Sequence, residues 1–240
     1  MRQSALWYNR IEAREGDPKR FPRHICGHKS NRWYMESTHS RNVGLAKFVN
    51  DCLYDVKNPA QLKDDRIRNT VTGFPCVMYI NDTLQGIYNF NLDRYSTYSY
   101  GYTSEYDPLV YEVSANSDTT AGAFYKWSPT SGKSELDYYK SDFEIVYPPT
   151  RAVTDDCAEL IRLVEWVYDS SDDEFTDNIE RYFNLQYLLR YFLGVYVFGA
   201  VDSLGKNMKL ATWDGLIWYP QFYDMDTTIG LDKVYCPTLW

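Results

Sequence analysis

The sequence predicts an α+β fold with a strand-rich N-terminal part, residues 1–148, and a helical C-terminal part, residues 149–240. Short β-rich runs lie before Pro148-Pro149, whereas apolar residues recur at helical spacing after it. The length of 240 residues suits one large domain or two small lobes around a cleft. We therefore expect the boundary between the two parts near residues 148–154.

The composition argues against several classes of function. A formal charge of −8 gives no basic footprint for a nucleic-acid backbone, so free DNA or RNA is not an expected partner. No apolar run reaches the roughly 18 residues that span a bilayer. The N-terminal residues lack the apolar stretch of a signal peptide, so the localisation stays undetermined. Five cysteines, an odd number with no CxxC pair, predict neither a disulfide framework nor a zinc site.

The N-terminal part is expected to contain one helix and four strands. Residues 1–32 are polar and indicate loops, and a helix is expected over residues 41–53. The strands are expected at residues 76–81, 85–92, 109–114 and 142–147. The first two strands form a hairpin with a tight turn around Asp82. Four alternating tyrosines follow the hairpin and suggest an exposed strand face, at Tyr95, Tyr98, Tyr100 and Tyr102.

The C-terminal part is expected to be helical until a final hairpin. Thr154 or Asp155 can cap a helix that continues to about residue 167. The acidic residues 169–178 are interpreted as a solvated linker to a long helix that contains Ile179 and Tyr196. Asp214-Gly215 then predicts a type I′ hairpin turn.

A specific group of polar residues surrounds this last hairpin. Asp202 and Asn207 follow the long helix, five positions apart, and Asp224 and Asp226 follow the hairpin. The catalytic segment of protein kinases has the same order of helix, Asp, Asn, hairpin and Asp. There, hard oxygen ligands hold Mg²⁺ or Mn²⁺ against the phosphates while another carboxylate faces the nucleophile. The spacing therefore predicts a metal site for phosphoryl transfer.

Each of these residues also has a structural interpretation. Asp202 could cap the turn after the helix, Asn207 could be a turn amide, and Asp224 with Asp226 could form a solvated loop. Their joint occurrence at kinase spacing favours the catalytic interpretation.

Three segments resemble the CotH family. Residues 201–230 are similar to its pattern of Asp-Ser-x-Gly-x-Asn, a hairpin and Trp-Asp-x-Asp-x-x-x-Gly, with Tyr223 in place of the Trp. Residues 73–93 resemble the family's earlier hairpin, with Asp82 where Gly is common. Residues 30–54 are similar to a preceding segment in which Arg-Asn opens a helix. The resemblance covers most of residues 30–230.

The resemblance implies an atypical, two-lobed kinase-like fold that binds ATP and a divalent metal and, in spore-forming bacteria, phosphorylates coat proteins. It implies that Asp202 is the catalytic carboxylate, that Asn207 and Asp224 are metal ligands, and that Asp226 supports them. The chain also resembles CotH-like domains in tail or appendage proteins of bacterial viruses. In that case its partners would be virion proteins in place of a protein substrate, and it would be located in a virion.

Two departures from the family pattern keep rival hypotheses open. Leu92 stands where the family has a Glu, and no upstream strand that could supply the nucleotide-site Lys is evident. The chain also stops soon after the metal motif, which suggests a fragment of a longer protein. A non-catalytic structural or binding module of a virion appendage is therefore the main alternative. A glycosyltransferase using Asp224-Met225-Asp226 ranks last, because the Gly-rich turn of a nucleotide-sugar domain is missing.

Overall fold

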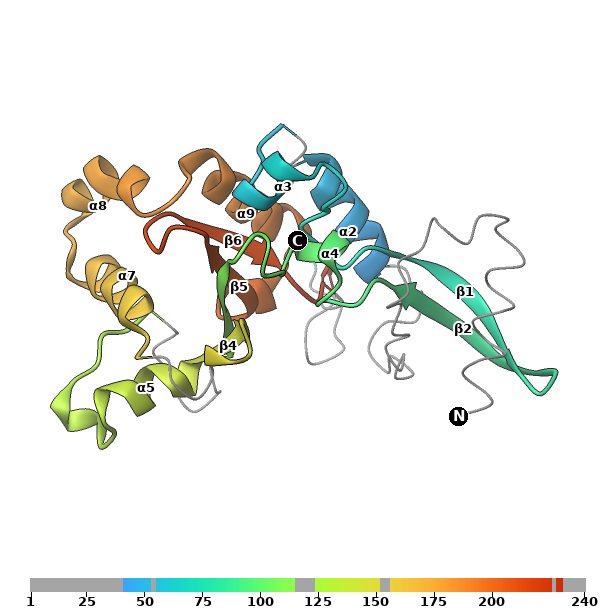
Figure 1. The fold of residues 1–240 in the computed structure, drawn as a ribbon, viewed down its shortest axis with the longest axis horizontal. Helices are drawn as coiled ribbons and strands as arrows, with labels where there is room; N and C mark the ends of the chain where they lie inside the picture. The colour runs from blue at the N-terminus through green and yellow to red at the C-terminus, as the bar shows by residue number, and fades with distance from the viewer. Residues whose placement is uncertain (1–40, 53–54, 115–123, 152–155, 226–227, 231–240) are drawn as a thin grey trace.

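The computed structural model describes residues 41–52, 55–114, 124–151, 156–225 and 228–230 (Figure 1). Up to residue 147 the elements are α2 (Arg41–Cys52), α3 (Pro59–Lys63), β1 (Gly73–Ile80), β2 (Thr83–Asn91), α4 (Thr97–Tyr100), β3 (Leu109–Ser114), the 3₁₀ turn η1 (Pro129–Ser131), α5 (Glu135–Asp142) and β4 (Phe143–Tyr147). The later elements are α7 (Ala158–Asp169), α8 (Asp172–Asn178), η2 (Ile179–Arg181), α9 (Leu185–Phe198), η3 (Val201–Leu204), β5 (Lys206–Thr212) and β6 (Trp218–Phe222). The described chain is therefore α+β, as expected.

Strands β1 and β2 form an antiparallel hairpin that projects from the rest of the molecule (Figure 1). Asn81 and Asp82 connect them with φ angles of 50° and 59°. A type I′ turn needs a positive φ at both central residues, and Asn and Asp tolerate this conformation better than most side chains. The predicted hairpin and its turn at Asp82 are confirmed.

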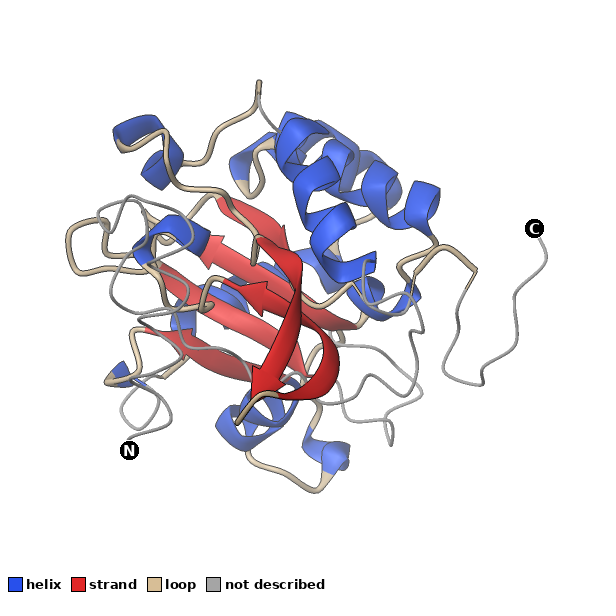
Figure 2. Ribbon diagram, turned by 90° about the vertical axis from the view of Figure 1, so that its right-hand side faces the viewer, coloured by secondary structure: helices blue, strands red, loops and turns tan. Residues whose placement is uncertain are grey.

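The remaining strands form one four-stranded antiparallel sheet in the order β4-β3-β5-β6 (Figure 2). Strands β3 and β4 precede the boundary predicted near residues 148–154, and β5 and β6 follow it. The central pair is β3 with β5, in which Glu112 is the partner of Lys209. The two parts recognised by composition thus share one sheet.

The sheet has one apolar face and one face with a polar row. The apolar face carries Tyr111, Leu210 and Phe222, which join buried residues of α7 and α9 in the main core. The ring of Phe222 lies 4.3 Å from that of Tyr191 on α9. Because side chains alternate along a strand, the next residues of the three strands, Glu112, Lys209 and Gln221, lie on the opposite face.

Three details of the C-terminal part differ from the sequence-based expectations. The N-cap of α7 is Cys157, and not Thr154 or Asp155, which lie outside the described residues. The acidic linker is largely helix α8, which begins with a capping box between Ser171 and Glu174. The expected long helix is divided, because η2 covers Ile179–Arg181 and α9 begins only at Leu185.

Two further expectations need correction. Residues 213–217 connect β5 and β6, so the connection is longer than a two-residue type I′ turn. In it, Asp214 Oδ1 accepts backbone hydrogen bonds from Leu216 and Ile217, each at 2.8 Å. The tyrosines after β2 do not form an exposed strand face, because Tyr100 ends helix α4 and both Tyr100 and Tyr102 are buried.

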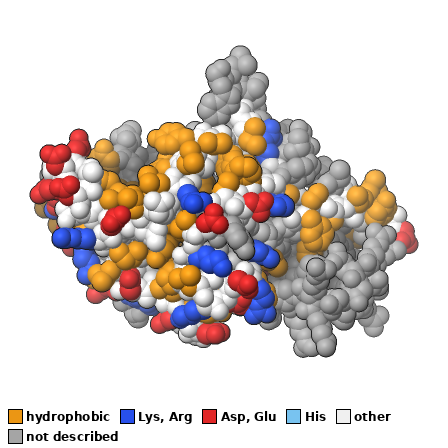
Figure 3. Space-filling view, turned by 90° about the horizontal axis from the view of Figure 1, so that it is seen from above, with side chains coloured by type: hydrophobic (Ala, Val, Ile, Leu, Met, Phe, Trp, Pro, Cys, Tyr) orange, Lys and Arg blue, Asp and Glu red, His pale blue; other side chains and the backbone are white. Residues whose placement is uncertain are grey.

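The surface seen from above in Figure 3 combines hydrophobic side chains over its middle with acidic ones at the end where Figure 1 places α8. Helix α9 contributes exposed apolar side chains, namely Leu189, Leu193, Tyr196 and Val197. Within the described part of the chain, no helix is both long and apolar enough to cross a membrane.

Candidate functional site

The end of helix α9 positions the segment that carries Asp202. Helix α9 ends at Gly199, whose φ of 59° is left-handed, and η3 follows directly. Tyr191 Oη donates a hydrogen bond of 2.7 Å to the Ser203 carbonyl, which ties η3 to the helix. Asp202 in η3 is half-buried. The hydrogen bond from Tyr191 therefore fixes the segment with Asp202 to helix α9 and the apolar core.

Asn207 and Asp224 lie at the same end of the β5–β6 pair. Met208 is the register partner of Phe222, so continuing the pairing by one residue brings Asn207 opposite Tyr223, the neighbour of Asp224. Asn207 and Asp224 have φ angles of 56° and 49°. Left-handed backbone at residues other than glycine is uncommon and gathers at functional sites, where the surrounding structure must hold it.

The start of helix α2 holds Asp224 in place. Asn42 Nδ2 donates a hydrogen bond of 3.0 Å to Asp224 Oδ1. The Asn42 side-chain oxygen accepts one of 3.3 Å from the backbone nitrogen of Met225. A segment from the beginning of the described chain thus fixes both the side chain and the backbone of the segment that follows β6.

Lys209 lies beside this strand end, on the polar face of the sheet. Its side chain is buried, and its Nζ has no hydrogen-bond partner within the described residues. The ammonium lies 4.0 Å from the ring centre of Tyr223 and 4.5 Å from that of Tyr100. Burial lowers the pKa of Lys209 to about 7, against the attraction of Glu112, which raises it. A charged lysine in this environment lowers the stability of the folded state.

Glu112 and Arg94 complete a charged group with Lys209. Arg94 Nη1 lies 3.5 Å from Glu112 Oε2 and donates a hydrogen bond of 3.4 Å to Tyr223 Oη. Burial raises the pKa of Glu112, while Lys209 and Arg94 act to lower it. The carboxylate thus has a cation on two sides.

Two hydrogen bonds connect this face with strand β6. Tyr100 Oη donates one of 2.6 Å to the Phe222 carbonyl, and Tyr102 Oη donates one of 2.6 Å to Gln221 Oε1. Their burial raises the pKa of both phenols well above the usual value, so they remain protonated donors.

The comparison with protein families decides the family. The profile of the family described as CotH kinase protein matches residues 61–236. The chain belongs to the CotH family. Within the curated proteins, no match is found. The matched region of this CotH-family chain includes Asp202, Asn207, Asp224 and Asp226, whereas Asn42 lies before it.

The expected metal ligands of the CotH-family chain are oxygen donors. Of the three expected ligands, Asp226 lies outside the described residues, which leaves the carboxylate of Asp224 and the amide of Asn207, with Asp202 as the expected catalytic carboxylate. The described residues contain no cluster of three or more His, Cys, Asp or Glu side chains suited to a metal ion. Carboxylate and amide oxygens fit the preference of Mg²⁺ and Mn²⁺ for hard ligands. Metal binding by this set stays a prediction.

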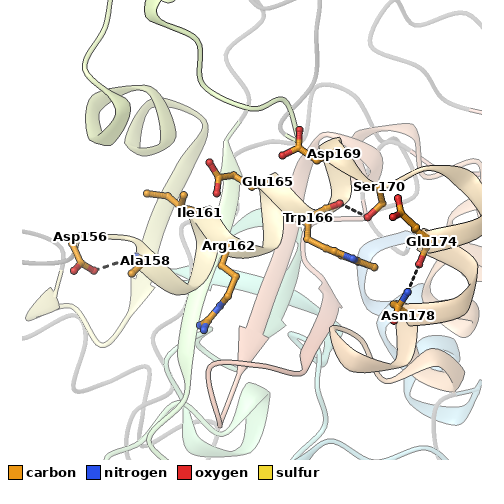
Figure 4. A pocket seen from close by; sticks show the side chains of 10 residues that line it. All are labelled: Asp156, Ala158, Ile161, Arg162, Glu165, Trp166, Asp169, Ser170, Glu174 and Asn178. Atoms are coloured by element: carbon orange, nitrogen blue, oxygen red, sulfur yellow. Dashed lines mark hydrogen bonds between the residues drawn. The ribbon is translucent and has the colours of Figure 1, made fainter.

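An open pocket lies elsewhere in the CotH-family chain, along α7 and α8 (Figure 4). Trp166 points from α7 toward Glu174 and Asn178 of α8, and its ring stacks on that of Tyr182 with centres 3.9 Å apart. The stacking gives Trp166 a structural role. None of the expected site residues lines this pocket, so we do not assign it to the predicted chemistry.

Sequence reasoning found the Asp202 to Asp226 segment but missed Asn42, Arg94, Glu112 and Lys209. For Asn42 a signal existed in the Arg-Asn that opens the helix in the family's preceding segment. For Glu112 and Lys209 the signal is a charged residue between two apolar neighbours in a strand, Tyr111 and Val113 or Met208 and Leu210.

Proposed function

We propose that this CotH-family chain has a two-lobed kinase-like fold, binds ATP with Mg²⁺ or Mn²⁺, and transfers the terminal phosphate to a protein hydroxyl. The observation that carries this proposal is the common strand end of β5 and β6, where Asn207 and Asp224 adopt left-handed backbone next to η3 with Asp202. Kinase chemistry needs oxygen ligands and a separate carboxylate brought together by a hairpin, and these residues follow that arrangement.

Each residue has a distinct role in the proposal. Asn207 and Asp224 hold the metal through amide and carboxylate oxygens, with Asp226 in support. The bound metal supplies positive charge against the phosphate oxygens. Asp202 orients the substrate hydroxyl and accepts its proton. The hydroxyl oxygen bonds to the terminal phosphorus as the bond from that phosphorus to the bridging oxygen breaks, and ADP leaves.

A second candidate is a structural or binding module that keeps the fold without turnover. Leu92 favours it, because an apolar residue occupies the position of the Glu that would orient the nucleotide-site Lys. In the structure, the Leu92 backbone nitrogen donates to the Thr72 carbonyl at 2.8 Å and continues the hairpin, so the strand is regular at this position. A location in a virion stays a prediction.

Thermal unfolding with ligand tests the binding part of the proposal. A ligand present at about 100 times its Kd stabilises the folded state by about 2.7 kcal/mol, which raises the melting temperature by roughly 5–11 °C. Mg²⁺ with ATP should produce this rise in the unmodified protein and in Asp202→Asn, but not in Asp224→Asn. Asp51→Asn is the control, because Asp51 is an exposed carboxylate paired with Lys47. An equal rise in Asp224→Asn and Asp51→Asn would remove Asp224 from the site.

A further inference from the structure

The charged group of Arg94, Glu112 and Lys209 has a role beyond folding. Glu112 and Lys209 are partners in the central strand pair, yet no ion pair or hydrogen bond to Lys209 Nζ exists within the described residues. An unpaired buried amine weakens a sheet, and an apolar side chain of the same length would pack there at less cost. Retained charge at a desolvated position points to a functional site.

The group lies beside the strand end that carries Asp224, the expected metal ligand. Tyr223 connects the two regions, since it precedes Asp224 in the chain and covers the ammonium of Lys209. Arg94 reaches the same Tyr223 from the segment after β2. The cations therefore stand beside the expected metal ligand, on the face of the sheet opposite the main core.

Arg94 is oriented but still accessible. Its contacts with Glu112 and Tyr223 both use Nη1, and 29% of its side chain remains exposed. Glu112 is 15% exposed at its side chain, so the partner that orients the guanidinium is largely shielded from solvent. Tyr95 also lies against the guanidinium, with its ring centre 4.9 Å from the central carbon of Arg94. The exposed part of a guanidinium oriented in this way can donate hydrogen bonds to phosphate oxygens.

The overall charge makes local cations necessary. The chain carries a formal charge of −8, which repels a polyphosphate. Glu112 attracts both cations and Asp93 also attracts Lys209, so the cation of this group that is accessible to a phosphate is Arg94. The electric field of a cation shielded from solvent extends further than that of an exposed cation, because water and salt screen the exposed one.

We propose that Arg94 contacts the phosphates of the nucleotide, with Glu112 fixing its guanidinium and Lys209 adding positive charge from beneath Tyr223. The inference rests on the proposed nucleotide site and specifies which residues of that site bind the phosphates. It also explains the departure at Leu92: the carboxylate that orients the phosphate-binding cation is supplied by Glu112 on β3, and the cation by Arg94.

Calorimetric titration separates phosphate recognition from turnover. The ligands are inorganic tripolyphosphate, ATP and adenosine, each with Mg²⁺. Arg94→Gln should weaken tripolyphosphate and ATP binding by roughly 10- to 100-fold, as expected for one charge-assisted hydrogen bond, and leave adenosine binding unchanged. The matched control is Arg66→Gln, because Arg66 is also an arginine paired with a carboxylate, that of Asp64 at 2.7 Å, and stacked on a tyrosine.

The outcomes distinguish this inference from the proposed function. Weaker tripolyphosphate binding in Arg94→Gln alone supports the inference, even if no phosphate transfer is detected. Unchanged tripolyphosphate binding in Arg94→Gln overturns the inference, even if phosphate transfer proceeds. An equal loss of tripolyphosphate affinity in Arg66→Gln also overturns it. So does an unmodified protein that does not bind tripolyphosphate. If Arg94→Gln does not fold, Arg94→Lys keeps the charge but not the fork, and full affinity in that variant would also overturn the inference.

Discussion

Replacing Lys209 with methionine should stabilise the protein and weaken its binding of phosphate. Methionine has nearly the length of lysine, is unbranched and adapts to irregular space, so the cavity left is small. The change removes a buried ammonium while the contact of 3.5 Å between Arg94 and Glu112 remains. The two effects therefore have opposite signs, which a purely structural role of Lys209 would not produce.

The magnitude follows from competing terms at this position. Contacts of 4.0 and 4.5 Å with the rings of Tyr223 and Tyr100 favour the ammonium, by about 2 kcal/mol for a desolvated cation. Removing an ammonium from water costs several kcal/mol, and a buried donor without a partner costs about 1–3 kcal/mol. Desolvation exceeds the ring contacts, and it also exceeds the attraction of Glu112, because the pKa of Lys209 is lowered overall to about 7. We expect Lys209→Met to raise the free energy of unfolding by about 1–3 kcal/mol, or the melting temperature by roughly 2–12 °C.

Chemical denaturation and tripolyphosphate titration measure the two effects on the same variant. Lys206→Met is the control for stability, because Lys206 is exposed on the same strand and should change the free energy of unfolding by less than about 0.5 kcal/mol. Lys209 makes no direct contact with the phosphates in the proposal, so Lys209→Met should weaken tripolyphosphate binding by less than Arg94→Gln does. Destabilisation by more than about 1 kcal/mol, or unchanged affinity, would refute the reasoning.

Three further changes test the supports of the site and the core. Asn42→Ala removes the 3.0 Å hydrogen bond to Asp224, and should cost about 1–3 kcal/mol of unfolding free energy and reduce the Mg²⁺-dependent rise in melting temperature. Tyr191→Phe removes the bond to the Ser203 carbonyl, and should cost about 1 kcal/mol in denaturation; a neutral result would show that this bond does not hold η3. Burial raises the pKa of Asp142, so its ionised form opposes folding at neutral pH, and stability is regained as the pH falls through the raised pKa. Asp142→Asn should therefore be the more stable form at neutral pH, with a lead that shrinks on acidification, and a lead independent of pH would contradict the raised pKa.

Local signals were sufficient for helix α2 and the four strands of the N-terminal part, but the expectation of one helix there is wrong, because α3, α4 and α5 are also present. The β1–β2 hairpin follows from two β-rich runs around a turn at Asp82, whose side chain tolerates positive φ. Helix α8 was missed because its composition is acidic, although Ser171 and Glu174 have the spacing of a capping box. In this case local capping chemistry was the better guide than average polarity.

The site was predictable only where its residues are close in sequence. Asp202, Asn207, Asp224 and Asp226 lie on one segment, and their order around the last hairpin suggests the chemistry. Arg94, Glu112 and Lys209 come from three separate segments, and only the register of β3 with β5 brings the last two together. From sequence alone, the alternating tyrosines around Tyr100 suggest an exposed strand face. In the structure the Tyr100 ring covers Lys209, which is distant in sequence, so local spacing does not reveal the burial of Tyr100.

Transfer of radiolabelled terminal phosphate from ATP tests the central claim most directly. The protein should label itself or a supplied protein acceptor in the presence of Mn²⁺ or Mg²⁺. Asp202→Asn should reduce the rate by roughly 10² or more with little change in tripolyphosphate affinity, while the surface control Asp51→Asn should match the unmodified protein. An unmodified protein that binds the metal but transfers no phosphate, or an Asp202→Asn variant as fast as the control, would contradict the kinase account.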